Sequence, residues 1–275
     1  MNERYLTSFE DQTTALSYTS GDATLVSPQV SLVGADEVVY SKEIPHESRI
    51  RFAKDETTGK LYFIIDGVVD LGLPSGLKWA DRNVGAETPQ DKGLYFSWGN
   101  VDGYAVNENG NVIDGYSFDR DTYATTLGGQ YTGSTLDTEH DAATVNMGSD
   151  WHMPTSAETL ELVQNTDHYY IDLSGKTVAI SELDGSKLRS ICFVKKGEEF
   201  HYNNRSNFIE LPFAGRFNGS LLGNDGLNGV VWSSSVNESR VEYARGLNFS
   251  SVGGLSGGNY SSYRYYGRSV RGVRA

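Results

Sequence analysis

The stretch of the chain with the clearest chemical character lies near its C-terminus, and its residues suit binding better than catalysis. From Asn237 to Tyr266, 19 of 30 residues are Ser, Gly, Tyr or Asn. Tyrosine offers a wide amphipathic ring with few rotatable bonds, while Ser, Gly and Asn adapt their hydrogen bonds to a partner. The composition therefore predicts a recognition surface. A solvated, glycine-rich loop with a few strand tyrosines accounts for it equally well, because Gly and Ser are also common in turns.

Catalytic chemistry has little support in the sequence. No His-Glu-x-x-His metal motif and no nucleophile elbow occurs. The single cysteine, Cys192, lies among apolar residues and is predicted to be a buried structural thiol. A carboxylate pair for sugar hydrolysis stays open, since Asp and Glu are plentiful, but nothing singles one out. We expect a protein that is not an enzyme. The five histidines are scattered along the chain: His46, His140, His152, His168 and His201.

One acidic and amide-rich loop raises the question of a calcium site. Asn107, Asn109, Asn111 and Asp114 are closely spaced. The spacing lacks the glutamate that ends a twelve-residue helix-loop-helix calcium loop, so these residues are interpreted as ordinary loop composition. We expect neither a metal ion nor a cofactor.

The charge of the chain limits its partners. The net charge is −13, and nucleic-acid binding needs a basic face, so no general affinity for nucleic acid is expected. From Arg240 onward the balance reverses, with six arginines and one acid, Glu242. This segment is either a local anion-attracting face or a set of strand arginines that pair with carboxylates elsewhere in the chain. We favour the pairing.

The sequence shows no segment that would take the chain into a membrane. No stretch approaches 18 apolar residues, and Met1–Tyr5 does not open an apolar signal segment. As written, the chain is expected to be made in the cytosol, with no signal peptide and no membrane insertion. A signal peptide that had been removed would leave no trace in this sequence.

The elements that would position the C-terminal stretch are mostly strands. Residues 1–55 hold short β-prone runs separated by turn residues, which predict a small module for attachment or oligomerisation. A hairpin of 49–52 with 61–65 would lead into the main domain. The clearest helix is predicted to start at Thr155, which forms a capping box with Glu158. Further predictions are a turn at 74–76, long loops over 100–140, a short helix near 180–183, and buried strands at 188–194, 208–211 and 230–232.

The segment 241–252 has the pattern of a half-buried strand with one irregularity near Gly246. Its apolar residues Ala244, Leu247 and Phe249 would face the core. The polar residues between them would face outward: Tyr243, Arg245, Asn248 and Ser250.

Four segments together resemble C-type-lectin-fold domains that are common in gut bacteria and their phages. The resemblance covers roughly residues 66–275 and implies an α+β fold with a small twisted sheet, two flanking helices and long irregular loops. The C-type-lectin-like domain would span 56–275 and follow the β-rich module at 1–55. The segments are Val69–Ala80 with Asn83–Ala86, Asp141–Thr144 with Trp151–Thr155, Leu211–Gly215, and Trp232–Ser235 through Tyr266–Arg271.

Some domains of this family are the variable proteins of diversity-generating retroelements, in which reverse transcription randomises adenines of a template copy. Template Asn codons then scatter mainly to residues such as Ser, Gly, Tyr, Asp and Arg. The region 237–266 lies between two fixed-looking motifs at the end of the chain, as in that family, with Glu238 and Glu242 as fixed positions. The implied ligand-binding residues are Asn237, Ser239, Arg240, Tyr243, Arg245, Asn248, Ser250, Ser251, Gly253, Ser256, Asn259, Tyr260, Ser262, Tyr263 and Tyr265.

On this resemblance, a fixed core would hold Trp232, Ala244, Leu247, Phe249, Val270 and Val273. The main binding anchors would be Tyr243, Tyr260, Tyr263 and Tyr265 with Arg245.

The resemblance implies a receptor-binding protein, such as a phage tail-fibre component, that attaches to a bacterial cell-surface protein or glycan. It would act in the virion or at a cell surface and form a homo-oligomer, a trimer by analogy. A bacterial surface adhesin that is not diversified, or a calcium-independent glycan-binding lectin, is the alternative. Formylglycine-generating enzymes share the fold but use two cysteines, and the calcium-lectin motifs Glu-Pro-Asn, Gln-Pro-Asp and Trp-Asn-Asp are absent.

Overall fold

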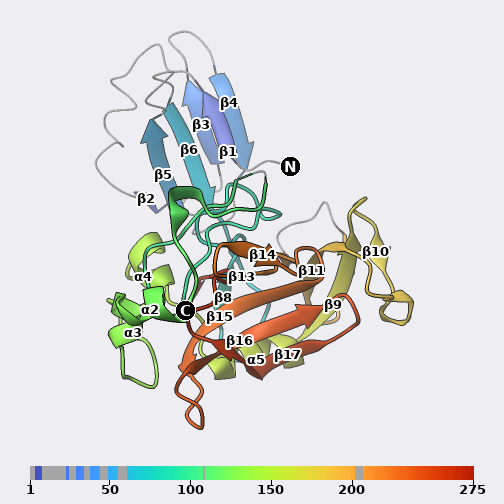
Figure 1. The fold of residues 1–275 in the computed structure, drawn as a ribbon. Helices are drawn as coiled ribbons and strands as arrows, with labels where there is room; N and C mark the ends of the chain where they lie inside the picture. Colours follow the sequence, from blue (N-terminus) through green and yellow to red (C-terminus); the bar gives the residue numbers. More distant parts are fainter. Residues whose placement is uncertain are drawn as a thin grey trace. The chain divides into compact units, whose positions relative to one another are not determined.

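A computed structural model describes residues 61–107, 109–201 and 207–275, together with five short strands that precede residue 61. The chain divides into two compact units, Met1–Val68 and Val69–Ala275. Figure 1 shows both units coloured along the sequence.

The described part of the N-terminal unit consists of strands, as its β-prone runs predicted. The predicted hairpin is confirmed, but it belongs to this unit, because β6 pairs with β1 as well as with β5. The expected boundary after residue 55 would cut this hairpin, so the division lies later, between Val68 and Val69. Two antiparallel sheets, ordered β1-β6-β5-β2 and β3-β4, are formed by β1 (Arg4–Thr7), β2 (Ala23–Thr24), β3 (Gln29–Val33), β4 (Val38–Glu43), β5 (Arg49–Lys54) and β6 (Leu61–Asp66).

The C-terminal unit is built from several small antiparallel sheets. Their orders are β10-β9-β11-β12, β13-β14, β15-β16-β17 and β18-β8-β7. The buried strands predicted near 188, 208 and 230 are confirmed as β11, β12 and β15. The strands are β7 (Val68–Val69), β8 (Lys78–Ala80), β9 (Thr166–Asp172), β10 (Thr177–Val178), β11 (Leu188–Lys195), β12 (Phe208–Pro212), β13 (Arg216–Asn218), β14 (Leu221–Gly223), β15 (Asn228–Val236), β16 (Tyr243–Ser250), β17 (Leu255–Tyr263) and β18 (Val273–Arg274).

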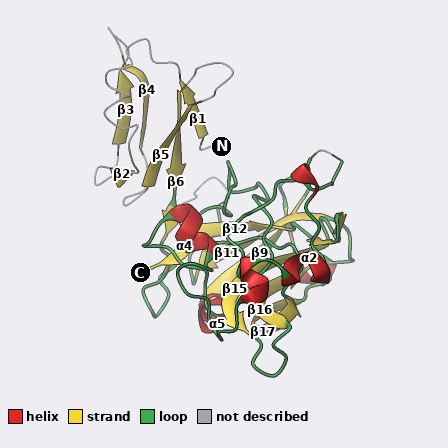
Figure 2. Ribbon diagram, turned by 60° about the vertical axis from the view of Figure 1, so that its left-hand side comes forward, coloured by secondary structure: helices red, strands yellow, loops and turns green. Residues whose placement is uncertain are grey.

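Helices are few and short in this unit, so its architecture is β-rich within the α+β class (Figure 2). The helix predicted near 180–183 is a single 3-10 turn, and the predicted loops of 100–140 contain two short helices. No helix in the described ranges is long and apolar enough to cross a membrane. The helical elements are η1 (Ile113–Gly115), α2 (Arg120–Ala124), α3 (Leu127–Gln130), α4 (Ala142–Met147), α5 (Ser156–Asn165) and η2 (Ile180–Glu182).

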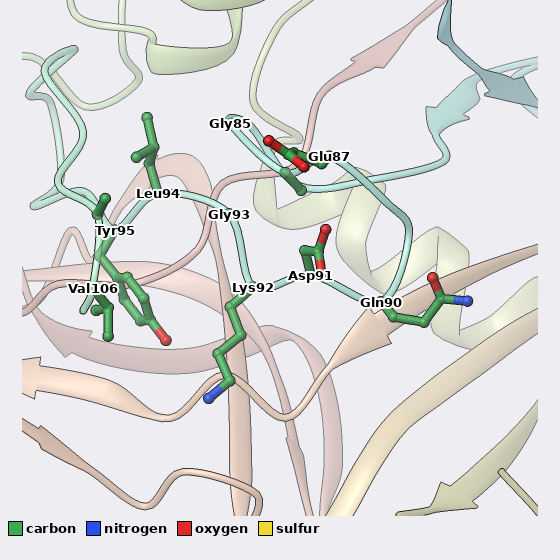
Figure 3. A pocket seen from close by; sticks show the side chains of 11 residues that line it. Gly85, Glu87, Gln90, Asp91, Lys92, Gly93, Leu94, Tyr95 and Val106 are labelled. Carbon is green, nitrogen blue, oxygen red and sulfur yellow. The ribbon is translucent and has the colours of Figure 1, made fainter. Parts of the chain in front are cut away.

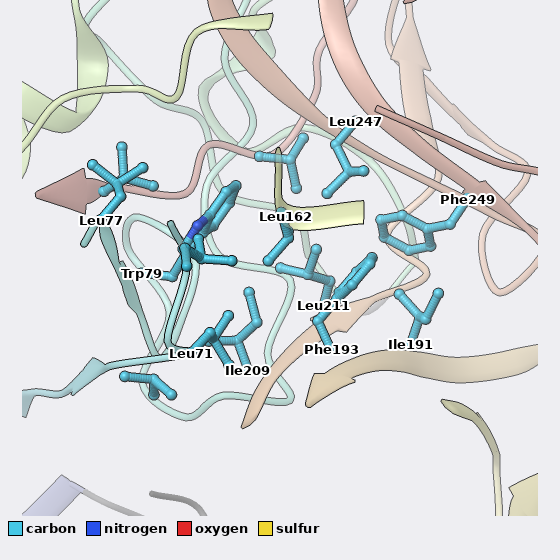
Figure 4. Packing of buried hydrophobic residues seen from close by; sticks show 14 of the residues in the cluster. Leu71, Leu77, Trp79, Leu162, Ile191, Phe193, Ile209, Leu211, Leu247 and Phe249 are labelled. Atoms are coloured by element: carbon cyan, nitrogen blue, oxygen red, sulfur yellow. The ribbon is translucent and has the colours of Figure 1, made fainter. Parts of the chain in front are cut away.

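The main core fills the space between these sheets and α5. Figure 4 shows side chains of β8, β11, β12, α5 and β16 pointing toward one another. Phe213 and Phe249 meet edge to face, with ring centroids 5.0 Å apart. Cys192 is fully buried, as predicted. The six residues predicted to form the fixed core are all fully buried: Trp232, Ala244, Leu247, Phe249, Val270 and Val273.

The predicted capping box at the start of α5 is confirmed. The Glu158 amide donates to Thr155 Oγ1 (3.2 Å), and the Thr155 amide donates to Glu158 Oε2 (2.6 Å). The second carboxylate oxygen, Oε1, lies 3.3 Å from Nε2 of His152. One glutamate thus joins the helix N-terminus to the strand-like segment before it.

This contact gives the domain a pH dependence. The hydrogen bond to Glu158 raises the pKa of His152, although burial opposes it. Because the pKa of His152 is higher in the folded protein than in the unfolded chain, where it is about 6.5, protonation of His152 stabilises the fold. This stabilisation is complete at pH values below about 6.5 and is lost as the pH rises through the folded pKa. Burial alone would raise the pKa of Glu158, but the hydrogen bonds from His152 and Thr155 lower it, so that carboxylate stays charged throughout this range.

We therefore expect the change His152→Gln to lower the melting temperature more at about pH 5.5 than at about pH 8. Thermal denaturation of both proteins at the two pH values measures the difference. An equal loss at both pH values would show that the His152 charge does not contribute.

The four sequence segments that carry the resemblance meet around the last residues of the chain. Arg271 is fully buried, and its guanidinium donates to two residues of the first segment and to Glu210, the residue just before the Leu211–Gly215 segment. Nε donates to Asn83 Oδ1 (2.9 Å), Nη1 to the Ala80 carbonyl (2.9 Å) and Nη2 to the Glu210 carbonyl (2.6 Å). A single side chain thus holds together the loop after β8, strand β12 and the C-terminus.

The remaining segment reaches the same place through the backbone. Val273 pairs with Trp79 in β8 and also exchanges backbone hydrogen bonds with His152, 2.9 and 3.0 Å long. Between Arg271 and Val273, a Cβ atom on Gly272 would lie 2.6 Å from Met147 Sδ and 2.9 Å from the Trp151 ring, so a larger residue would require these side chains to shift. These motifs therefore share a structural role, which is to hold residues 271–273 in place; we call these residues the C-terminal strip.

Candidate functional site

The predicted binding residues centre on strands β16 and β17. The burial of β16 alternates, with Tyr243, Arg245 and Asn248 partly exposed while Ala244, Leu247 and Phe249 are buried. The predicted irregularity is confirmed as a register shift between Gly246 and Asn248. The outward orientation predicted from the sequence for Tyr243, Arg245, Asn248 and Ser250 is thus borne out by the burial pattern.

Strand β17 adds residues to the same face. Directly opposite residues of an antiparallel pair project to the same side of a sheet. Tyr263 lies opposite Tyr243, Ser261 opposite Arg245, and Ser256 opposite Asn248. We call this set of six the outer face. Asn259, next to it on β17, is exposed and accepts a hydrogen bond at its carbonyl from Arg245 Nη1 (3.1 Å).

Four tyrosines gather where β16 begins and β17 ends. Ring centroids are 4.3 Å apart for Tyr243 and Tyr263, 5.1 Å for Tyr263 and Tyr265, and 4.9 Å for Tyr265 and Tyr266. We call these residues the tyrosine cluster. The guanidinium of Arg240 lies 3.8 Å from the ring centroid of Tyr243, which is cation–π geometry.

Two hydroxyl groups of the cluster hold their protons more tightly than a free tyrosine does. Burial, and then the neighbouring Tyr266, raise the pKa of Tyr265 to about 12. A hydrogen bond with Tyr263 raises the pKa of Tyr243. These two rings are therefore suited to stacking and hydrogen bonding.

The turn after β17 is fixed from beneath by Arg264. Its Nη2 donates to the carbonyls of Gly128 (2.7 Å) and Tyr131 (2.9 Å), and its Nε donates to the Tyr123 hydroxyl (2.9 Å). The guanidinium also lies 4.4 Å from the ring centroid of Trp98, which is fully buried. The tyrosine cluster consequently stands on a rigid base, the condition for binding without a large loss of conformational entropy.

Three predicted face residues are buried, so their assignment to the surface is wrong. Asn237, Ser251 and Ser262 are 8%, 4% and 4% exposed. Asn237 organises the turn before β16, because its Oδ1 accepts from the Ser239 amide (3.1 Å). Ser262 Oγ accepts from Arg268 (2.9 Å), and the Ser251 amide bonds to the Leu227 carbonyl. Each has a structural partner that the local sequence does not reveal.

Tyr260 is also misplaced in the sequence prediction. It lies opposite Gly246, on the side of the sheet away from Arg245, and its hydroxyl accepts from Arg268 Nη2 (3.2 Å). Ser239 and Arg240 are exposed in the turn before β16. Ser250 and Gly253 lie at the other end of the β16–β17 hairpin. The structure thus brings most of the predicted residues together but divides them between two sides and two ends.

Four residues at the site were not predicted as binding residues, and one of them is Ser261 of the outer face. Tyr266 was assigned to a fixed motif, and Arg264 was not singled out from its neighbours. Arg216 of β13 lies 5.0 Å from the ring centroid of Tyr266 and comes from outside the predicted region. Nothing in the sequence around Arg216 signals this contact.

The preferred prediction for the C-terminal arginines, pairing with carboxylates elsewhere, is wrong for the buried Arg268 and Arg271 and for the partly exposed Arg264. Arg264, Arg268 and Arg271 donate their hydrogen bonds to carbonyl, hydroxyl and amide oxygens. Among the described contacts, Arg240 forms a local pair with Glu242 (3.3 Å). The planar fork of arginine has five donors, which neutral oxygens can satisfy inside a protein.

A second candidate site is a surface depression of about 420 Å³ formed by 85–95 with Ala105 and Val106 (Figure 3). Lys92 at its rim pairs with Asp225 (2.5 Å). The Tyr95 hydroxyl donates to the Ala214 carbonyl (2.6 Å), and burial raises its pKa. Its lining offers no nucleophile beside a base, and none of the predicted binding residues lies in it.

Metal ligands do not converge in the described parts of the chain. No group of three or more His, Cys, Asp or Glu side chains there could hold a metal ion. Asn107, considered above for calcium, uses its Oδ1 to accept from the amides of Asn109 (2.9 Å) and Asn111 (3.1 Å). It shapes its own turn.

The chain was compared with protein-family models, with curated proteins and with solved structures, and no match is found in any of the three comparisons. The outer face and the tyrosine cluster are therefore the features of the chain that indicate a function.

Proposed function

We propose that the chain is a non-enzymatic recognition protein whose C-type-lectin-like domain binds a partner on a bacterial surface. The binding surface is the outer face together with the tyrosine cluster. One observation carries the proposal: polar and aromatic residues of β16 face outward while the apolar residues between them are buried, and β17 adds polar and aromatic residues directly opposite the outward ones.

The energetics of such a surface favour binding. Binding energy concentrates in a few aromatic and arginine anchors, and loss of one commonly costs about 2 kcal/mol or more. Tyr243, Tyr263 and Tyr265 supply rings that are already packed against one another, so little rotational freedom is lost on contact.

We further propose that the outer face is diversified by a retroelement. The alternation on β16 supports this, because outward substitutions usually change stability by less than about 0.5 kcal/mol, whereas changes in the core cost several times more. The corresponding genomic test is a nearby reverse-transcriptase gene with a repeat of the 3′ end that differs at adenines. Its absence would remove diversification and leave the binding proposal standing.

The setting we propose is a phage tail fibre or another receptor-binding component, in a virion or at a cell surface, assembled as a homo-oligomer. A trimer would multiply weak single-site contacts into high avidity. Sedimentation of the full chain at micromolar concentration tests the assembly, and a monomer would contradict it.

A strain panel tests binding itself. The purified chain is incubated with diverse bacteria, untreated or treated with protease or periodate. Binding to a subset of strains, lost after one treatment, supports the proposal and separates a protein receptor from a glycan. Binding to no strain, or to every strain equally, would contradict it.

A second candidate is a calcium-independent glycan-binding adhesin that is not diversified. The stacked pair Tyr263 and Tyr265, with rings 24° from parallel, favours it as a platform for a sugar ring. Periodate-sensitive binding without an adenine-differing repeat would identify this case.

A further inference from the structure

Arg268 is a buried cation whose hydrogen bonds are incomplete. It is 2% exposed, and its Nη2 donates to Ser262 Oγ (2.9 Å) and to the Tyr260 hydroxyl (3.2 Å). Its Nε is buried without an acceptor. Removing a charge from water without a counter-charge is costly, so a buried guanidinium normally has an anionic partner.

Arg216 is a second cation beside it. The guanidinium carbons of Arg216 and Arg268 lie 5.0 and 5.7 Å from the centroid of the same ring, that of Tyr266. Neither arginine forms an ion pair with a carboxylate of the described residues. Burial lowers the pKa of Arg268, and the positive charge of Arg216 lowers it further. Two arginines therefore lie near one tyrosine ring without an ion pair to a described carboxylate, in a chain whose net charge is −13.

The Tyr260 hydroxyl beside Arg268 is oriented to donate a hydrogen bond. Because the Tyr260 oxygen accepts from Arg268, its hydrogen points away from Arg268 and is available to another acceptor. Tyr260, Tyr266 and Arg216 are all partly exposed, so a ligand can reach them. The corner thus presents donors and positive charge, with buried Arg268 as the common neighbour.

We propose that Arg216, Arg268, Tyr260 and Tyr266, the arginine corner, bind an oxyanion: a carboxylate, sulfate or phosphate group. Arg216 and the Tyr260 hydroxyl contact the oxyanion, and Arg268 supplies charge from beneath. Charge-assisted hydrogen bonds of this kind are about twice as strong as neutral ones. The inference rests on the proposed function, since it names the chemical class of the partner as acidic. Tyr266 joins the corner to the tyrosine cluster, its ring centroid lying 5.6 Å from that of Tyr263.

The test uses the full chain and sodium sulfate as the probe, with sodium chloride at equal ionic strength as the reference. The ¹⁵N resonance of Arg268 Nε, assigned through the variant Arg268→Lys, is followed by NMR. We expect saturable shifts with sulfate and about a tenfold weaker dissociation constant in Arg216→Gln, which corresponds to one lost charge-assisted contact. Shifts that merely follow ionic strength, or identical affinity in Arg216→Gln, would overturn the proposal.

Two further variants sharpen the result. Lys176→Gln removes one positive charge from the exposed turn between β9 and β10, outside the outer face and the tyrosine cluster, and should leave sulfate affinity unchanged, whereas an equal loss would mean that general charge is sensed. Tyr260→Phe keeps the ring and removes the hydroxyl, and should weaken sulfate binding several-fold.

Cell binding separates this proposal from the one on which it rests. Sulfate binding without binding to any strain would contradict the recognition function and leave the anion site intact. If Arg216→Gln reduces the affinity for sulfate but does not weaken binding to the recognised strains, the partner is not bound through an acidic group at this site, which would contradict the proposal. Acetate and inorganic phosphate, titrated in the same way, distinguish carboxylate-bearing from phosphate-bearing ligands.

Discussion

Replacing Arg271 with methionine is expected to lower the free energy of unfolding of the C-terminal domain by about 3–5 kcal/mol, a large fraction of the roughly 5–15 kcal/mol that stabilises an ordinary domain. The guanidinium is fully buried and donates to Asn83, to the Ala80 carbonyl and to the Glu210 carbonyl. Methionine fills a similar volume but leaves these three buried acceptors without donors. Each such acceptor costs about 1–3 kcal/mol, and relaxation recovers part of the sum.

Urea denaturation followed by tryptophan fluorescence measures this loss, and Arg240→Met is the matched control. Arg240 is exposed, so its replacement should change the free energy of unfolding by less than about 0.5 kcal/mol. Arg271→Lys should fall between the two, because an ammonium group cannot reach three acceptors in one plane. If Arg271→Met stays within 1 kcal/mol of the unchanged protein, on the order of an ordinary surface change, Arg271 does not hold the C-terminal strip.

The double change Tyr243→Ala with Tyr263→Ala is expected to reduce binding to a recognised strain by about a hundredfold to a thousandfold. Each ring removed as an anchor costs about 2 kcal/mol, and 1.4 kcal/mol is a tenfold change in affinity. Both rings are partly exposed on the outer face, so the melting temperature should change little. Tyr260 is left out, because its hydroxyl accepts from the buried Arg268.

Flow cytometry of labelled protein on cells, together with thermal denaturation, measures both effects. Phenylalanine at both positions should retain most of the affinity, since the rings remain. Tyr169 lies in β9, in a different sheet from the outer face, and its partly exposed ring stacks on Phe200. The change Tyr169→Ala removes this ring and should leave strain binding unchanged. A large drop in melting temperature for the double alanine variant would instead mean that the two rings are structural.

Local sequence patterns predicted the parts of the fold that depend on residues close together in the sequence. The spacing of Ala244, Leu247 and Phe249 predicted which side of β16 is buried, and the capping box predicted the start of α5. Tyr260 could not be assigned in the same way. The register shift in β16 and β17, with Gly258 at φ +79°, changes which side the residues beyond it face. Composition alone does not reveal such a shift.

The glycines of β17 show a related limit. The sequence favoured either adaptable binding residues or a loop for this stretch. A Cβ atom on Gly257 would collide with the carbonyl oxygen of Thr159, so this glycine allows the strand to lie close to α5 (Figure 2). The requirement comes from a helix about a hundred residues earlier, and no local pattern contains it.

The buried arginines were unpredictable for the same reason. An arginine between glycine, serine and tyrosine has the local sequence of a surface residue. The acceptors of Arg271 lie 188 and 191 residues earlier in Asn83 and Ala80. The contact of Arg216 with Tyr266 likewise joins separate strands and loops. Only the folded chain brings these arginines to their partners.

The central claim is that a rigid scaffold presents exchangeable side chains, and joint replacement of the outward residues tests it most directly. Tyr243, Arg245, Asn248, Ser256, Asn259 and Tyr263 are exchanged together for other members of the set Ser, Gly, Tyr, Asn, Asp and Arg, and the variants are scored on the strain panel. We expect the variants to stay folded, with melting temperatures within a few degrees of the original, as about 1 kcal/mol of destabilisation would give, while the set of bound strains changes or is lost. Variants that unfold, or that bind the same strains as before, would contradict it.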